Sequence, residues 1–288
     1  MKRHTKAFWL FVAPAVILFS IFFLVPLGLS VGLSFTNYDG WKKCEFVGLS
    51  NYSKLFQTPD FYKTVGRTVI YTLFSLPFKV IIPLLIAALV TSNYMRGTSA
   101  IRTVVYIPVL ISALVVGTTI NWMFGQEYGL INYLIKLAGG TPLQWSLNPA
   151  LATFVISFAS NWASTGFYML MFIGGIKNIS PELYEAASVD GATGVQMFSK
   201  ITLPLLMPTF FIVLLLSTVN LLKEYATVQG ITSGGPGTST TYIVQYIFDQ
   251  GFTQYRYGYA SAIGAAISLL FIAIALAQFK MTKGGEIS

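Results

Sequence analysis

The sequence predicts an all-α membrane protein with six transmembrane helices, and three observations lead to this fold class. Of the 288 residues, 55% are hydrophobic and only 10% are charged. The hydrophobic residues gather into runs of about 20, the length at which a helix crosses roughly 30 Å of hydrocarbon. Charges or turn residues flank every run. The predicted spans of this single transmembrane domain, residues 1–288, are 8–33, 68–92, 104–124, 151–174, 205–222 and 259–279.

The first apolar run is expected to stay in the mature protein. Lys2, Arg3 and Lys6 precede it, as basic residues precede the core of a cleavable signal peptide. Such a core, however, has only about 7 to 15 residues and ends at a small-residue cleavage site. This run continues past Pro26 to Thr36, so we interpret it as a retained membrane span.

The distribution of Lys and Arg predicts that both chain termini lie in the cytoplasm. With the N-terminus inside, nine basic residues lie on the cytoplasmic side: Lys2, Arg3, Lys6, Arg96, Arg102, Lys177, Lys200, Lys280 and Lys283. Seven lie outside: Lys42, Lys43, Lys54, Lys63, Arg67, Lys136 and Arg256. Five of these seven belong to one outer loop, residues 36–67, so the other loops have a clear excess of positive charge inside.

Charge and composition exclude several functions. The formal charge of +8 fits anchoring to anionic membrane lipid, and nothing indicates nucleic acid. Cys44 is the only cysteine and His4 the only histidine, so we expect neither a disulfide within the chain nor a metal site. The spans hold no paired carboxylates and no nucleophile–base set, which argues against an enzyme. A G-x4-G-K-[ST] phosphate loop is also missing, so any ATP that drives this protein must bind to another subunit.

The polar segment 177–203 is predicted to form two short helices in the cytoplasm. Ser180 is a candidate N-cap, and a proline and an acidic residue follow it. Gly191 is expected to end the first helix. Thr193 and Gln196 have the spacing of a capping box, so a second helix is expected to begin at about Gly194. Two short helices broken at a glycine would make a compact knob on which a partner's groove can close.

The spacing E-A-A-x3-G-x9-I-x-L-P across this segment resembles the coupling loop of permease subunits in binding-protein-dependent ABC importers. The residues expected to couple the chain to the ATPase are Glu185, Ala186, Ala187, Asp190, Gly191, Ile201, Leu203 and Pro204. The resemblance implies that this EAA loop docks onto an ATPase subunit. For a lone Glu-Ala-Ala the alternative is an ordinary capped loop between membrane helices.

Two further stretches resemble the outer loop and last span of sugar permeases. They are a T-x-G-G-P-G segment at residues 232–237 and G-Y-A-S-A at residues 258–262. Many relatives have a third glycine where Ser233 stands here. A flexible hairpin is the alternative for the glycine-rich segment by itself. Together with the spans and the EAA loop, these two stretches make the chain similar to permeases of the carbohydrate-uptake family, of the maltose-permease type. Within that family it resembles most the permeases for multiple sugars or raffinose-like oligosaccharides.

The resemblance implies the fold and the partners of a type I ABC importer permease. The chain would lie in the bacterial cytoplasmic membrane and form half of a translocation pathway, with a second homologous permease completing a heterodimer. Two ATP-binding subunits and a periplasmic or extracellular sugar-binding protein would complete the machine. ATP and Mg would bind to those partner subunits, and this chain would bind no cofactor. ATP-driven closure would open the pathway outward, and hydrolysis would reset it inward.

Polar side chains inside the spans mark the expected substrate path, because each is costly in a membrane and tends to face a pore or a partner. In the fourth span, Ser157, Asn161, Ser164 and Tyr168 share one helical face. The fifth span has a second stripe at Ser217, Asn220 and Glu224, and Tyr225 follows it. The predicted path residues are Asn161, Trp162, Ser164, Phe167, Tyr168, Ser217, Asn220, Lys223 and Glu224. For any one of them the alternative is packing or hydrogen bonding between helices, or an interfacial position for the tryptophan.

Several alternatives stay open. A stand-alone ion-coupled secondary transporter would need a relay of intramembrane acids, whereas Glu224 is the one candidate. Glycerol phosphate is an alternative substrate, although the spans have no arginine cluster for a phosphate. Lys79 in the second span either snorkels, pairs with Glu224 or meets a partner subunit. The aromatic outer loop 36–67 either lies along the membrane surface or contacts the binding protein.

Overall fold

The computed structural model describes residues 2–41, 44–92 and 97–281, with side chains from Trp9 onward. Four basic residues of the charge distribution lie outside the described residues: Lys42, Lys43, Arg96 and Lys283. The side chains of Lys2, Arg3, His4 and Lys6 lie outside them as well. In the described part every regular element is a helix, and the one β feature is an isolated antiparallel bridge between Thr36 and Phe46. The predicted all-α class is confirmed.

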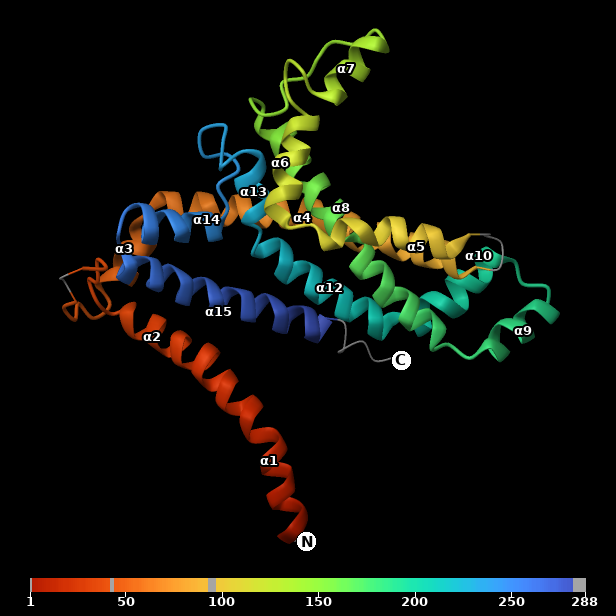
Figure 1. The fold of residues 1–288 in the computed structure, drawn as a ribbon, viewed down its shortest axis with the longest axis horizontal. Coiled ribbons are helices and arrows are strands. Elements are labelled where there is room, and N and C mark those ends of the chain that lie inside the picture. Colours follow the sequence, from red (N-terminus) through yellow and green to blue (C-terminus); the bar gives the residue numbers. More distant parts are fainter. Residues whose placement is uncertain (1, 42–43, 93–96, 282–288) are drawn as a thin grey trace. The chain divides into compact units, whose positions relative to one another are not determined.

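The helices follow one another along the chain as drawn in Figure 1. The first are α1 (Lys2–Phe19), which continues through a π-helical turn (Ser20–Leu24) into α2 (Val25–Leu33), then α3 (Ser50–Gln57) and α4 (Pro59–Thr91). Next come α5 (Thr98–Tyr106), a 3-10 turn (Ile107–Leu110), α6 (Ala113–Met123), α7 (Leu130–Leu137) and α8 (Pro149–Lys177). The rest are α9 (Pro181–Val189), α10 (Gly194–Met197), a π-helical turn (Phe198–Thr202), α11 (Leu203–Leu205), α12 (Met207–Leu222), α13 (Ala226–Ile231), α14 (Ile243–Phe248), a π-helical turn (Asp249–Thr253) and α15 (Tyr257–Met281).

Three of the described helical segments are long and apolar enough to cross a membrane: Trp9–Leu33, α4 and α15. Two further candidates are broken pairs, Thr98–Leu110 with α6 at 102° and Gly194–Leu205 with α12 at 70°. The predicted spans 104–124 and 205–222 therefore belong to bent helical segments. The described residues thus hold three to five apolar spans, and the predicted number of six is not confirmed. The 29 residues of α8 are long enough to cross, but polar side chains occupy the middle of this helix.

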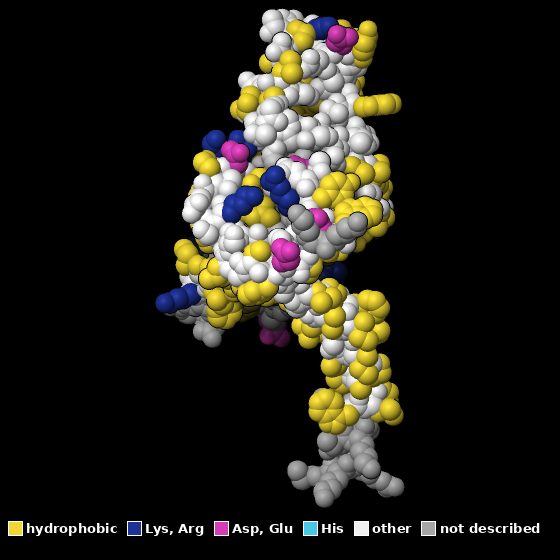
Figure 2. Space-filling view, turned by 90° about the vertical axis from the view of Figure 1, so that its left-hand side faces the viewer, with side chains coloured by type: hydrophobic (Ala, Val, Ile, Leu, Met, Phe, Trp, Pro, Cys, Tyr) yellow, Lys and Arg dark blue, Asp and Glu magenta, His cyan; other side chains and the backbone are white. Residues whose placement is uncertain are grey.

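The chain divides into two compact units. One contains the residues up to Tyr62 together with Tyr246–Leu270. In this first unit, the side chains of residues 9–33 are mostly hydrophobic and mostly exposed, as the yellow surface of this segment in Figure 2 shows. Gly258 lies against the chain after α2, and its backbone N–H donates to the carbonyl of Tyr38 at 3.0 Å. A Cβ at this glycine would collide with the carbonyl oxygen of Thr36, which gives the G-Y-A-S-A motif a packing reason for its first residue.

The second unit contains Lys63–Gln245 and the residues from Phe271 onward. Within it, α6 and α13 lie side by side (Figure 1), and two glycines permit their close approach. A Cβ at Gly117 would lie 3.0 Å from the Cα of Gly230. One cluster of buried side chains surrounds this contact and includes Tyr71 and Tyr242. A second cluster joins α4, α8 and α12, so α8 contributes to both parts of the core.

The glycine-rich segment 232–237 has the irregular backbone that its composition predicts. Gly234 and Gly237 adopt positive φ angles of 96° and 58°, which favour glycine. Thr240 fixes the segment through its hydroxyl, which donates to the carbonyl of Gly235 at 2.6 Å, and through its N–H, which donates to the carbonyl of Gly234 at 3.1 Å. These bonds give the segment a defined conformation.

Candidate functional site

The polar stripe of α8 faces the interior of the second unit. Ser157 and Asn161 are buried, with 3% and 8% of their surface exposed. The hydroxyl of Ser75 on α4 donates to Ser157 Oγ at 2.8 Å. Asn161 Nδ2 donates to Ser157 Oγ at 3.3 Å and to the carbonyl of Ser75 at 3.4 Å. The hydroxyl of half-buried Ser164 donates to the carbonyl of Ser160 in the same helix, at 2.8 Å. This stripe therefore ties α8 to α4.

The polar stripe of α12 meets the stripe of α8 at one hydrogen bond. Asn220 Nδ2 donates to the phenolic oxygen of Tyr168 at 2.8 Å. Tyr168 is fully buried, whereas Asn220 is exposed. Ser217, one turn earlier on α12, is also fully buried. The two stripes that the sequence predicts on separate spans thus lie against each other in the folded chain.

A charged network links three parts of the second unit. Lys79 on α4 is 3% exposed, and its Nζ donates to Ser160 Oγ on α8 at 3.0 Å. The Ser160 hydroxyl donates to Glu224 Oε2, just after α12, at 2.6 Å. The hydroxyl of Tyr71 donates to the same carboxylate oxygen at 3.4 Å. Of the three alternatives for Lys79, the structure favours pairing with Glu224, with Ser160 as the bridge.

Two buried oxygens among the predicted path residues accept or donate no hydrogen bond within the described part of the chain. They are Asn161 Oδ1 and Ser217 Oγ. Buried polar groups in native proteins are nearly always hydrogen-bonded, so each such atom points to a partner that one chain by itself does not supply. A substrate hydroxyl, a water molecule or a polar group of another subunit would satisfy them.

Three members of the predicted path, Trp162, Phe167 and Lys223, lie outside the buried network. Trp162 and Phe167 are 41% and 44% exposed on α8. Phe167 packs edge-on against Tyr168, with ring centroids 5.3 Å apart. Lys223 is exposed at the end of α12, and Tyr225 is half-buried beside Glu224. The structure thus separates a buried hydrogen-bonding layer from a set of exposed rings on the same helices.

Sequence reasoning missed Ser160, Tyr71 and Ser75. Ser160 lies on α8 between Ser157 and Asn161 of the predicted stripe, and the sequence analysis predicted no polar face for α4. A signal was present, because Tyr71, Ser75 and Lys79 recur every four residues and so share one face of α4. That face carries the polar contacts of α4 with α8.

The knob at 177–203 has the predicted two-helix form. The first helix, α9, begins after Ser180, although the serine side chain makes no capping bond, and it ends at Val189, two residues before Gly191, whose φ is 76°. The second helix, α10, begins at Gly194 as predicted, and its capping box is present: Gln196 N–H donates to Thr193 Oγ1 at 3.4 Å, and Thr193 N–H donates to Gln196 Oε1 at 2.7 Å. Figure 1 places α9 far from α13 within the second unit.

The proposed coupling residues differ in exposure. Glu185, Ala186, Asp190, Gly191 and Pro204 are exposed, and Ala187, Ile201 and Leu203 are half-buried. The hydroxyl groups of Tyr184 and Thr202 lie 2.9 Å apart, so a hydrogen bond holds α9 against the chain that leads into α12. Val189 and Val195 are 89% and 78% exposed. The knob thus has a base fixed by this bond, and its surface exposes two valines together with the acidic residues Glu185 and Asp190.

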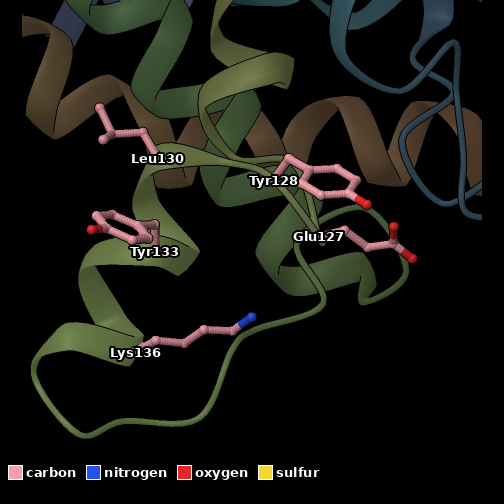
Figure 3. Close-up of a pocket in the computed structure, with 5 residues that line it drawn as sticks. All are labelled: Glu127, Tyr128, Leu130, Tyr133 and Lys136. Carbon is pink, nitrogen blue, oxygen red and sulfur yellow. The ribbon is translucent and has the colours of Figure 1, made fainter.

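A small open pocket of about 390 Å³ lies on the outer segment between α6 and α8 (Figure 3). Leu130, Tyr133 and Lys136 line it from α7, and Glu127 and Tyr128 line it from the preceding turn. None of the predicted site residues lines this pocket. In the described residues no group of three or more His, Cys, Asp and Glu side chains lies close enough to hold a metal ion.

A helical chain with apolar helices long enough to span a membrane and a layer of buried polar side chains between them is typical of a membrane transport protein. The chain belongs to the family described as binding-protein-dependent transport system inner membrane component, whose sequence pattern matches residues 49–281. The predicted resemblance to carbohydrate-uptake ABC transporter permeases is confirmed, because the relatives of this chain include several sugar permeases.

The chain is 34% identical over 289 residues to the probable ABC transporter permease protein YesP of Bacillus subtilis, covering 98% of this chain and 92% of the relative. It is 31% identical to the arabinooligosaccharides transport system permease protein AraP of the same organism, covering 95% and 88%. Among solved structures it is similar to a bacterial ABC transporter that imports the acidic polysaccharide alginate, with a TM-score of 0.85, 27% identity, and coverage of 98% of this chain and 97% of that chain. A complex of the bacterial alginate ABC transporter with an alginate pentasaccharide-bound periplasmic protein matches with a TM-score of 0.86 and 26% identity, covering 97% and 95%.

Proposed function

We propose that this chain is one of two homologous permease subunits of an ABC importer for oligosaccharides and forms half of its translocation path. The observation that carries the proposal is the contact of the two polar stripes at Asn220 and Tyr168, beside buried oxygens of Asn161 and Ser217 that lack partners. Sugar hydroxyls supply the donors and acceptors that such atoms need. Exposed Trp162 and Phe167 offer aromatic faces for the C–H surfaces of sugar rings.

Six spans and cytoplasmic termini belong to this proposal. The five candidate spans described above would be joined by α8, whose 29 residues are about 43 Å long as a helix. Its polar side chains lower its hydropathy, and three of them, Ser157, Ser160 and Asn161, are buried against α4 rather than facing lipid. A span of this kind is expected where a helix lines a path, since polar groups in membranes face protein or water.

Coupling would pass through the knob. Its exposed surface, with Glu185 and Ala186 on α9, offers one charge and a smooth contact for the groove of an ATP-binding subunit. Two such subunits would bind ATP and Mg, and their closure would move α12 through the Tyr184–Thr202 contact. A second permease would complete the path, and a periplasmic or extracellular sugar-binding protein would deliver substrate. Anionic membrane lipid would contact the cytoplasmic lysines.

One rival function and one rival substrate can be distinguished from this proposal. A stand-alone ion-coupled transporter would import sugar without partners, and membership of a binding-protein-dependent family argues against it. Glycerol phosphate is the rival substrate, and an anion of that kind would need arginines in the path.

The test is uptake of labelled maltose, lactose, arabinotriose, raffinose and glycerol phosphate by the reconstituted complex, with and without its binding protein. Uptake of a sugar that requires ATP, both permeases and the binding protein is the expected result. Uptake by this chain by itself under an ion gradient would replace the proposal with the secondary transporter. ATP-driven uptake of glycerol phosphate and of no sugar would replace the substrate.

A further inference from the structure

Lys79 is a cation in a place where a cation is costly. It lies in the middle of α4, inside a candidate membrane span, and only 3% of its surface is exposed. Charged side chains within membrane spans are retained when they pair with an opposite charge or serve a site. The second unit therefore needs a carboxylate near Lys79, and Glu224 supplies it.

The Ser160 hydroxyl connects Lys79 and Glu224 through two hydrogen bonds. A lysine ammonium group can only donate hydrogen bonds, and a carboxylate can only accept them. The Ser160 hydroxyl lies between them, 3.0 Å from Lys79 Nζ and 2.6 Å from Glu224 Oε2, so it accepts from the lysine and donates to the carboxylate. The direction of this chain of bonds is fixed by the chemistry of its ends.

Glu224 is held by one oxygen and offers the other. Its Oε2 accepts from Ser160 and also from Tyr71, at 3.4 Å. Tyr71 is itself fully buried and stacks on Tyr242, with ring centroids 4.5 Å apart, so its hydroxyl has little freedom. Within the described residues Oε1 accepts no hydrogen bond from the protein, and Glu224 is half-buried rather than enclosed.

We propose that Lys79, acting through Ser160, is a positioning residue for Glu224 and fixes the free Oε1 as the hydrogen-bond acceptor for a saccharide hydroxyl. The inference rests on the proposed function, in which the stripe of Asn220 and Glu224 lines the path. A direct Lys–Glu contact would occupy the carboxylate with its counter-ion. The serine bridge leaves one oxygen available while it restricts rotation of the carboxylate, and hydrogen bonds to a charged acceptor are stronger than neutral ones.

The test measures KM and maximal rate of ATP-driven uptake in proteoliposomes, using whichever of labelled maltose, lactose, arabinotriose or raffinose the wild-type complex imports fastest. Ser160→Ala removes only the bridging hydroxyl, and we expect KM to rise about tenfold while the amount of assembled complex stays the same. Ser160→Thr keeps a hydroxyl and is expected to restore KM. Thr165→Val is the matched control, because Thr165 lies on the same helix and its hydroxyl donates to the carbonyl of Asn161, with no other partner among the described residues.

The double variant separates positioning from a general structural role. If Ser160 acts through Glu224, Ser160→Ala adds nothing to the rise in KM caused by Glu224→Gln. Lys79→Met is expected to raise KM as Ser160→Ala does. If Lys79→Met prevents assembly of the complex, the variants Ser160→Ala and Ser160→Thr still test the inference. A wild-type KM in Ser160→Ala, or effects that multiply in the double variant, would overturn the inference while leaving sugar import intact. Failure of the wild-type complex to import any sugar would instead overturn the proposed function.

Discussion

The side-chain amide of Asn220 on α12 donates a 2.8 Å hydrogen bond to the phenolic oxygen of Tyr168 on α8. Tyr168 is fully buried and Asn220 is exposed, so the bond anchors an accessible amide to a fixed partner. An amide held in this way can present its remaining hydrogen-bonding groups to a ligand at little cost in side-chain entropy. The relationship gives the polar stripes a testable role in transport.

Replacing Asn220 with Ala is expected to lower sugar uptake about tenfold at sub-saturating substrate, because a positioned hydrogen-bonding group is lost from the path. Assembly with the partner subunits should persist, since Asn220 is exposed in this chain. Initial rates of ATP-driven uptake and the amount of purified complex give the two readouts. Asn161→Ala is expected to act in the same direction. Unchanged uptake in both variants would remove these residues from the path.

A substitution at Gly191 tests coupling through the knob. Gly191 has a φ of 76° with open space around it, so alanine fits sterically but strains the backbone by about 1–2 kcal/mol. We expect Gly191→Ala to weaken stimulation of the ATPase by the sugar-loaded binding protein, together with uptake. Gly97 is a matched control, because it has a φ of 73° and the same open surroundings outside the EAA loop.

Equal effects of the two glycine substitutions would mean that general backbone strain, and not docking, explains the loss. A second variant places a bulky residue at Gly191. If both variants keep the stimulated ATPase activity and the uptake of the wild type, this result would argue directly against a rigid coupling knob. The measurement is ATP hydrolysis and sugar uptake in the same proteoliposomes, so that their ratio can be compared between variants.

The parts of this protein that the sequence predicted well are those set by local chemistry. The capping box of Thr193 and Gln196 and the break at Gly191 depend on residues a few positions apart, and both appear in the structure. The apolar runs likewise predicted the helical class. The 102° bend between the 3-10 turn and α6 was not predicted, although Pro108 lies in that turn and Ser112 directly precedes α6. In an otherwise continuous apolar run, these two residues do not by themselves distinguish a bent span from a straight one.

The candidate site was only half visible in the sequence for a related reason. Helical spacing places Ser157 and Asn161 on one face, and the structure buries both. Spacing within one helix cannot identify the partner across an interface, and so Ser160 and Tyr71 were missed. The bridge from Lys79 to Glu224 joins residues far apart in sequence, and only the packing of α4 and α8 against the end of α12 brings them together.

Close packing of α6 and α13 predicts that Gly230 tolerates no side chain. A Cβ there would lie 2.7 Å from the carbonyl oxygen of Leu114 and 2.9 Å from the Cα of Gly117, both backbone atoms that cannot move aside cheaply. Overpacking of this kind costs about 1–3 kcal/mol, so Gly230→Ala should lower the thermal midpoint of the purified complex. Gly264→Ala on α15 is the control, because nothing lies within 4 Å of its Cβ position. Equal midpoints for the two variants would contradict the packing argument.

The single cysteine allows a direct test of the membrane orientation. Cys44 is exposed and lies in the loop predicted to be outside, so a membrane-impermeant maleimide should label it from the outer face of intact spheroplasts. In a Cys44→Ser background, Val195→Cys places a thiol on the knob at a position where the native side chain is 78% exposed. If the knob is cytoplasmic, this thiol reacts only after permeabilisation, in cells that lack the ATP-binding subunits. The opposite labelling pattern would place the EAA loop outside, where no ATPase can reach it, and would refute coupling through this loop together with the predicted orientation.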